Sequence, residues 1–183
     1  MALPRMKPES TALLVIDVQE RLMPTIAAAA RVEANCAILA RAATVLGMPV
    51  ICTEQYVKGL GHTVPTVRDA LPSTAHVVEK TRFSALVDGV RAALRTHRTP
   101  NVLVCGVEAH VCVLQTVLDL LALGYEVHVP HDAVASRSQG NHERALDRLT
   151  ASGAVISSTE SVLFEWCGVA GTPEFRQISQ LVK

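Results

Sequence analysis

Val102-Leu-Val-Cys-Gly-Val-Glu-Ala-His-Val-Cys-Val-Leu-Gln-Thr116 is the stretch that decides the fold of this chain. Its first residues, Val102 to Cys105, form an apolar and β-branched run that predicts a buried strand. Gly106 then permits a sharp turn of the backbone. From about Ala109 the apolar residues recur with helical spacing. The stretch therefore predicts a strand that leads through a turn into a helix.

Cys112 lies in the first turn of this predicted helix, just beyond the end of the strand. Backbone N–H groups at a helix N-terminus lack partners within the helix, and the helix dipole is positive there. These conditions favour the thiolate, so we expect the pKa of Cys112 to lie below the free value of about 8.5. The alternative is an inert core residue, because free cysteine is among the most buried residue types.

The composition is that of a globular protein with a sizeable core. The chain has 183 residues, of which 49% are hydrophobic and 19% charged. It predicts a single domain over residues 1–183, with residues 1–10 as a flexible N-terminal tail. Lys plus Arg and Asp plus Glu number 17 each, so no basic excess is available to hold a nucleic acid backbone.

The five cysteines are odd in number and lack CxxC spacing, which argues against a disulfide framework and against a zinc site. Residues 1–10 lack the apolar core of a signal peptide. No apolar stretch reaches the ~18 residues that a membrane span needs. We therefore expect a cytoplasmic protein without a membrane partner.

Buried strands alternate with helices along the whole chain. This alternation predicts a parallel, doubly wound α/β sheet with helices on both faces. A long loop interrupts the pattern from Glu54 to about Thr74, and loops of that length are often functional. The expected strands are 12–16, 50–53, 76–79, 102–105, 126–130 and 154–157, and the expected helices are 27–46, 84–97, 109–121, 141–152, 159–166 and 173–181.

Three chemically distinct side chains, Asp17, Lys80 and Cys112, each follow the carboxyl end of a predicted strand. Because ligands bind at that edge of a doubly wound sheet, we expect the three to form one site. Asp17 could instead cap a helix, and Lys80 could be an ordinary exposed lysine. Their common position nevertheless favours the site.

Three segments resemble the isochorismatase-like cysteine hydrolases: Leu14-Val-Ile-Asp-Val-Gln19, Glu79-Lys-Thr-Arg-Phe-Ser84 and Cys105-Gly-Val-Glu-Ala-His-Val-Cys112. The order and spacing of Asp, Lys and Cys in them are similar to the triad of that family. Thr53-Glu-Gln-Tyr56 and Lys58-Gly-Leu-Gly61 resemble the isochorismatase domain-containing protein branch. The resemblance spans about residues 10 to 182.

The resemblance implies a three-layer, Rossmann-like sheet of six parallel strands. It implies that Cys112 attacks an electrophilic carbon, usually an amide carbonyl, and forms a thioester. Asp17 would carry the thiol proton to the leaving amine, and Lys80 would stabilise the thiolate and hold the carboxylate. A cis peptide is implied at Val107–Glu108, with the N–H groups of Glu108 and Cys112 aimed at the oxyanion.

Two departures from relatives in the superfamily narrow the chemistry. Nicotinamidases bind a metal through an Asp-x-His motif after the second strand, where this chain has Thr53-Glu-Gln-Tyr56. His62 alone is better explained as a loop histidine, so we expect no metal and no other cofactor. Isochorismatases hydrolyse a vinyl ether without a cysteine, so Cys112 points towards acyl transfer instead.

The prediction is a cysteine-dependent hydrolase of a small amide-like, or related C–N or ester, substrate. The candidate pocket residues are Gln19, Gln55, Tyr56, Phe83 and His110, for which helix surface or loop packing is the alternative. A catalytically silent scaffold and a vinyl ether hydrolase are alternative functions, and a nuclease is disfavoured by the balanced charge. A mean hydropathy of +0.29, together with the resemblance, predicts a homo-oligomer, a dimer or larger.

Overall fold

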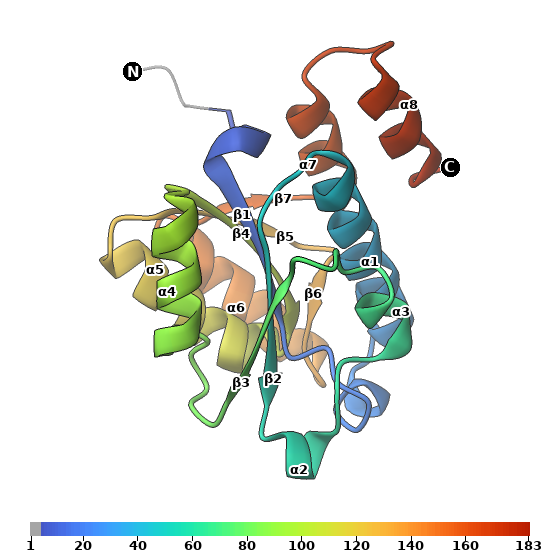
Figure 1. Cartoon of the computed structure of the whole chain (residues 1–183). Helices are drawn as coiled ribbons and strands as arrows, with labels where there is room; N and C mark the ends of the chain where they lie inside the picture. The colour runs from blue at the N-terminus through green and yellow to red at the C-terminus, as the bar shows by residue number, and fades with distance from the viewer. Residues whose placement is uncertain (1–4) are drawn as a thin grey trace.

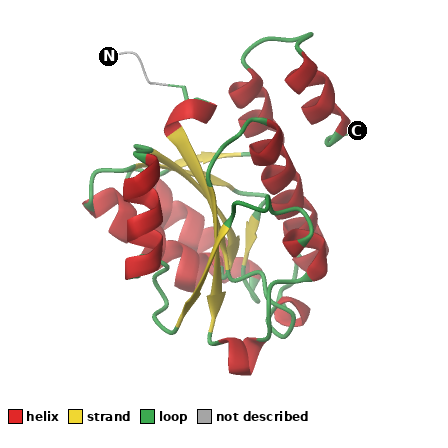
Figure 2. Ribbon diagram, in the orientation of Figure 1, coloured by secondary structure: helices red, strands yellow, loops and turns green. Residues whose placement is uncertain are grey.

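The computed structural model describes residues 5–183 and contains one parallel sheet between two layers of helices (Figure 1; Figure 2). The strand order is β3-β2-β1-β4-β5-β7, and the short β6 pairs with β4 beyond the end of β5. The predicted doubly wound α/β fold is confirmed, with six strands in the main order. The strands are β1 (Thr11–Ile16), β2 (Val50–Gln55), β3 (His76–Lys80), β4 (Asn101–Val107), β5 (Glu126–Pro130), β6 (Val134–Ala135) and β7 (Val155–Ser157).

Helices cover both faces of the sheet because successive side chains of each strand point to opposite faces. Leu13, Val15 and Leu103 pack in one core with α1, α3, α7 and α8. Leu14 and Val104 pack in the other with α4, α5 and α6 (Figure 1). The helices are α1 (Ala29–Val45), α2 (Val57–Leu60), α3 (Pro65–Arg68), α4 (Asp88–His97), α5 (Leu114–Ala122), α6 (Gln139–Ala151), α7 (Thr159–Cys167) and α8 (Pro173–Gln180), with single turns η1 (Pro8–Ser10), η2 (Met23–Thr25) and η3 (Ala109–Val113).

The direction of winding reverses between β1 and β4. From β1 the chain adds β2 and then β3 on one side, and from β4 it adds β5 and β7 on the other. Connections on both sides of such a switch point leave a crevice at the carboxyl ends of the two central strands. Asp17 follows β1 directly and Cys112 lies in η3 after β4, so the fold brings both to this crevice.

Gly106 does not turn the chain, contrary to the sequence prediction, because β4 continues through it to Val107. Its φ is +111°, and a Cβ built there would lie 2.0 Å from the carbonyl oxygen of Ile16. The glycine is required because β1 approaches the backbone of β4 closely, and only glycine accepts that conformation without a clash.

Other boundaries differ from the prediction where tertiary contacts decide them. The long loop after Gln55 contains α2 and α3, and α4 begins at Asp88 rather than at residue 84. The helix after β4 starts as the π-helical turn η3 before α5. Met6 is buried and its N–H donates to Glu165 at 2.7 Å, so residues 6–10 are not the flexible tail that was expected. None of the helices in residues 5–183 is long and apolar enough to cross a lipid bilayer.

Candidate active site

A buried ion pair occupies the carboxyl edge of the central strands. Lys80 Nζ donates to Asp17 Oδ2 at 2.6 Å, and both side chains have no exposed surface. Thr53 Oγ1 donates to the other oxygen, Asp17 Oδ1, at 2.7 Å. Each carboxylate oxygen of Asp17 therefore has a hydrogen-bond donor, which is the condition for burying a charge in a protein interior.

Lys80 is the last residue of β3, whereas the sequence analysis ended this strand at Glu79 and placed Lys80 just after it. Its ammonium also donates to Gln55 Oε1 at 2.7 Å and lies 3.2 Å from the carbonyl oxygens of Arg82 and Phe83. An ammonium has three protons, and acceptors lie on every side of it. The lysine is thus held at a fixed point beside Asp17.

Cys112 lies in η3 and is buried close to Asp17, whose carboxylate interacts with its thiol. The pKa of Cys112 is raised to about 12, because burial and, to a smaller extent, the Asp17 charge raise it, while Lys80 only partly opposes both. The expected lowering of this pKa by the helix N-terminus is therefore wrong. Loss of hydration and a facing carboxylate outweigh the helix dipole, and the thiol is neutral at pH 7.

Asp17 also has a perturbed pKa. Burial raises it, while the charge and hydrogen bond of Lys80 and the hydroxyl of Thr53 lower it by a smaller amount. A carboxylate with a raised pKa is a stronger base. The arrangement therefore places a strengthened base beside a neutral thiol.

Glu108 connects β4 to η3. The Val107–Glu108 peptide bond is cis. Glu108 Oε2 accepts hydrogen bonds from the backbone N–H and the Nε of Arg137, at 2.9 and 3.1 Å. The backbone N–H of Glu108 itself donates to no acceptor within residues 5–183. It is therefore available to a ligand that reaches Cys112.

Two of the five candidate pocket residues hold the site together. Gln19 is fully buried, and its Nε2 donates to the carbonyl oxygens of Gln55 and Gly61 at 2.9 and 2.6 Å. Gln19 Oε1 accepts the N–H of Gln55 at 2.7 Å. Gln55 in turn uses its side chain on Lys80 and on the carbonyl oxygen of Thr81. Both amides thus position the segment after β2.

The other three candidates are more accessible. Tyr56 and Phe83 are 57% and 55% exposed. His110 Nδ1 lies 2.9 Å from Ser136 Oγ, at the start of η3. Tyr56 borders a cavity of about 550 Å³ at the β3 edge, and the remaining four candidates do not line it.

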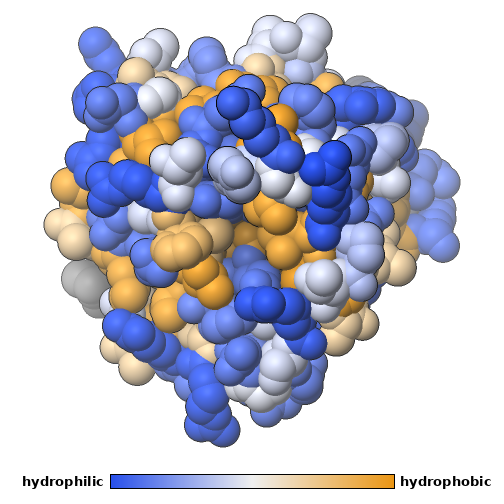
Figure 3. Space-filling view, turned by 90° about the horizontal axis from the view of Figure 1, so that it is seen from below, coloured by the Kyte–Doolittle hydropathy of each residue, from blue (hydrophilic) through white to orange (hydrophobic). Residues whose placement is uncertain are grey.

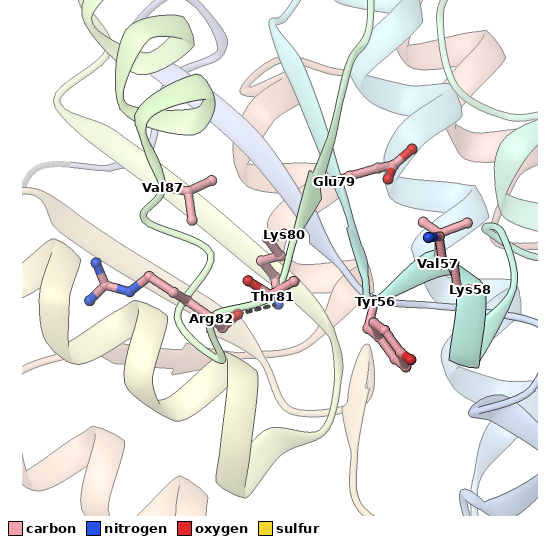
Figure 4. Close-up of a pocket in the computed structure, with 8 residues that line it drawn as sticks. All are labelled: Tyr56, Val57, Lys58, Glu79, Lys80, Thr81, Arg82 and Val87. Carbon is pink, nitrogen blue, oxygen red and sulfur yellow. Dashed lines mark hydrogen bonds between the residues drawn. The ribbon is translucent and has the colours of Figure 1, made fainter.

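Lys80 is among the residues that border this cavity. Figure 4 shows Lys80 and Thr81 between Tyr56 and Arg82. Figure 3 shows the face at the carboxyl edge of the sheet, which is hollowed near its centre and bordered by hydrophobic and hydrophilic residues. Asp17 and Cys112 do not line the cavity itself.

Residues 5–183 contain no group of three or more His, Cys, Asp or Glu side chains placed to hold a metal ion. His62 Nδ1 lies 2.9 Å from Glu54 Oε2, and Glu54 Oε1 accepts the N–H and hydroxyl of Thr63. Glu54 therefore fastens residues 62 and 63 of the loop after β2 to the end of that strand.

The sequence analysis missed Thr53 and Arg137. Thr53 pairs with Ile16 in the sheet, one residue before Asp17, and this register could have indicated its contact with the carboxylate. Arg137 lies in a polar loop, and nothing in its spacing indicates Glu108 as its partner.

Comparisons with known proteins agree with this geometry. A model of the isochorismatase domain matches residues 11–161. The secreted isochorismatase effector Isc1 of Phytophthora sojae is 43% identical over 98% of this chain and 87% of its own. Isochorismatase domain-containing protein 2 of Danio rerio is 40% identical over 97% of this chain and 89% of its own.

Among solved structures, the MAR1 ribonuclease of Caenorhabditis elegans is 37% identical with a TM-score of 0.94, covering 98% of this chain and 92% of its own. A Bacillus subtilis nicotinamidase, at 20% identity and a TM-score of 0.73, shares the fold over 81% of this chain and 99% of its own. The family match spans most of the chain, and the relatives cover nearly all of it. The chain therefore belongs to the isochorismatase family.

Proposed function

We propose that this member of the isochorismatase family is a hydrolase that uses Cys112 as the nucleophile on a small amide-like substrate. Asp17 is the general base and acid, and Lys80 is the cation that keeps Asp17 charged. The intermediate is a thioester on Cys112, and a related C–N or ester bond would react in the same way.

The observation that carries the proposal is the fully buried Lys80–Asp17 pair beside the Cys112 thiol. Removing two charges from water costs several kcal/mol per ion, and apolar side chains of similar volume often stabilise a protein as well or better. Stability alone therefore does not favour such a pair. A reaction that moves a proton between Cys112 and Asp17 does.

The first half-reaction follows from these positions. As Cys112 Sγ attacks the carbonyl carbon, its proton moves to Asp17, and the carbonyl oxygen becomes an oxyanion. When the tetrahedral intermediate collapses, the C–N bond breaks and Asp17 gives its proton to the leaving amine. The raised pKa of Asp17 suits both transfers, because the group must take a proton and then release it.

The second half-reaction regenerates the enzyme. Water attacks the thioester and Asp17 accepts one of its protons. The C–S bond then breaks to release the acid, and Asp17 returns the proton to the sulfur, which restores the Cys112 thiol. The N–H groups of Glu108 and Cys112 are assigned to the oxyanion in both halves. The free N–H of Glu108 within residues 5–183 supports the first of these donors.

Ammonia release from a panel of small primary amides, with intact-protein mass spectrometry, tests this function. We expect turnover and an acyl adduct in the wild type and neither in Cys112→Ala. Cys167→Ala is the matched control, because Cys167 is a partly exposed cysteine on α7 that is remote from the proposed chemistry. Equal turnover in Cys112→Ala and wild type would exclude the mechanism.

A second candidate, RNA cleavage, is favoured only by the names of relatives such as the MAR1 ribonuclease of C. elegans. The same three proteins should be incubated with a labelled RNA. Cleavage that Cys112→Ala abolishes would assign the site to RNA, whereas cleavage that persists in Cys112→Ala would come from elsewhere.

We also propose that the protein assembles as a homo-oligomer, most simply a dimer, as the sequence analysis expected. Tyr56, Val77 and Phe83 are large exposed hydrophobic residues at or near the edge strand β3, which supports an uncovered apolar surface there. Light scattering at micromolar protein should give a multiple of 19.6 kDa.

A further inference from the structure

A pair of histidines lies at the opposite end of the sheet from Cys112. His76 is the first residue of β3 and His97 is the last residue of α4, so both belong to the amino edge. Both are exposed, and their Nε2 atoms lie 3.5 Å apart. Within residues 5–183 neither imidazole has another hydrogen-bond partner. His76 lies four positions before Lys80 along β3, which corresponds to a distance of about 13 Å along the strand.

We propose that His76 and His97 form a binding site for a borderline divalent cation such as Zn²⁺. Zinc binds imidazole nitrogen at about 2.0–2.1 Å with tetrahedral angles, which requires the two nitrogens to be about 3.3–3.4 Å apart. The observed 3.5 Å meets this requirement after a small rotation of either ring. An octahedral ion with ligands at right angles would need only about 3.0 Å, so a tetrahedral ion fits better.

The backbone holds the two ligands at this separation. α4 packs directly on β3, where a Cβ built at Gly89 would lie 3.1 Å from the side chain of Val78. The planes of the two rings are inclined by 61°, so they do not stack face to face and both Nε2 atoms stay accessible. The packed backbones that carry the two ligands therefore lose little entropy when an ion binds.

The end of α4 adds a favourable field for a cation. His97 is in its last turn, where the unpaired carbonyl groups make the helix terminus negative. Arg95, in the same turn, and Arg98 oppose this field, but both are exposed and screened by solvent. Water would complete the coordination, since residues 5–183 supply no third side-chain ligand of the kind that zinc takes there.

Isothermal titration of untagged protein with zinc chloride tests the site. We expect one equivalent in the wild type and an affinity at least about tenfold weaker in both His76→Gln and His97→Gln. The double variant should lose no more than either single variant, because one remaining imidazole no longer chelates. His131→Gln, at another exposed histidine, is the control and should bind as the wild type does.

Retention of the untagged proteins on an immobilised zinc column gives a second readout that does not depend on activity. The wild type should be retained and both single variants should elute early. Circular dichroism would show that the variants are folded. Zinc binding that survives in His76→Gln and His97→Gln, or its absence in the wild type, would overturn the proposal and leave the proposed hydrolase unaffected.

Discussion

Replacement of Lys80 by methionine should expose the cost of the buried carboxylate. The ammonium lies 2.6 Å from Asp17 Oδ2, and neither side chain has exposed surface. Methionine fills a similar volume but leaves Asp17 without its cation. Breaking a buried ion pair in this way costs about 3–5 kcal/mol of unfolding free energy. For a chain of this size that corresponds to a fall in Tm of about 6–20 °C.

The loss should depend on pH. Burial already raises the folded-state pKa of Asp17, and Lys80 is the largest influence that lowers it, so Lys80→Met should raise this pKa further. Between the unfolded value of about 3.9 and the raised folded value, the folded protein binds more protons than the unfolded chain. Stability therefore falls as pH rises through that window, and the variant should recover stability between pH 8 and pH 5.

Urea unfolding followed by circular dichroism at pH 5 and pH 8 measures both effects. Lys58→Met is the matched control, because Lys58 is exposed near the same cavity and should change stability by less than about 0.5 kcal/mol. Asp17→Asn combined with Lys80→Met should be more stable at pH 8 than Lys80→Met alone. A Lys80→Met protein within about 1 kcal/mol of wild type at pH 8 would refute the reasoning.

Three shorter predictions concern reactivity, packing and metal. Alkylation of Cys112 by iodoacetamide, read by peptide mass spectrometry, should be slow at pH 7.5 and rise to pH 10 without a plateau, because the pKa of Cys112 is about 12. Gly106→Ala should cost at least about 3 kcal/mol in thermal unfolding, since its Cβ would meet the Ile16 carbonyl at 2.0 Å. Ammonia release should survive EDTA, because Thr53-Glu-Gln-Tyr56 lacks the Asp-x-His ligands; activity that is lost with EDTA and restored by zinc would contradict this.

The sequence predicts those parts of the fold that local patterns determine. The apolar runs of β1, β2 and β4 are buried on both faces, and their alternation with helices is sufficient to predict the winding. β6 is only two residues long in a polar loop, and its pairing with β4 depends on contacts that no local pattern carries. Gly106 was interpreted as a turn because the close approach of β1, which requires a glycine there, is likewise not visible in the local pattern.

The candidate site also has features that the sequence predicts and features that it does not. Asp17 and Lys80 could be paired from their places at the ends of parallel strands. The sequence could not show that Gln19 and Gln55 use their amides on the backbone and on Lys80, because a free glutamine in a loop has the same local pattern. These side chains and their partners come from separate elements, and only the packing of the folded chain brings them together.

The pKa of Cys112 shows how this difference changes the mechanism. From the sequence, a cysteine at a helix N-terminus beside a lysine should be a ready thiolate. In the structure, Lys80 donates to Asp17 and to three further oxygens, and its charge only partly opposes the effects of burial and of the carboxylate on the sulfur. Burial and the carboxylate then raise the pKa of Cys112 to about 12.

A thiol of that kind reacts only when a base removes its proton as the new bond forms. Asp17 is the base at hand, and burial raises its own pKa towards that of the thiol. The thiolate is then formed only when a substrate carbonyl lies against Cys112, which protects the resting enzyme from oxidation and from stray electrophiles. On this reasoning, Asp17→Asn should abolish turnover through loss of the base, even though removal of a negative charge beside Cys112 makes the thiol easier to ionise.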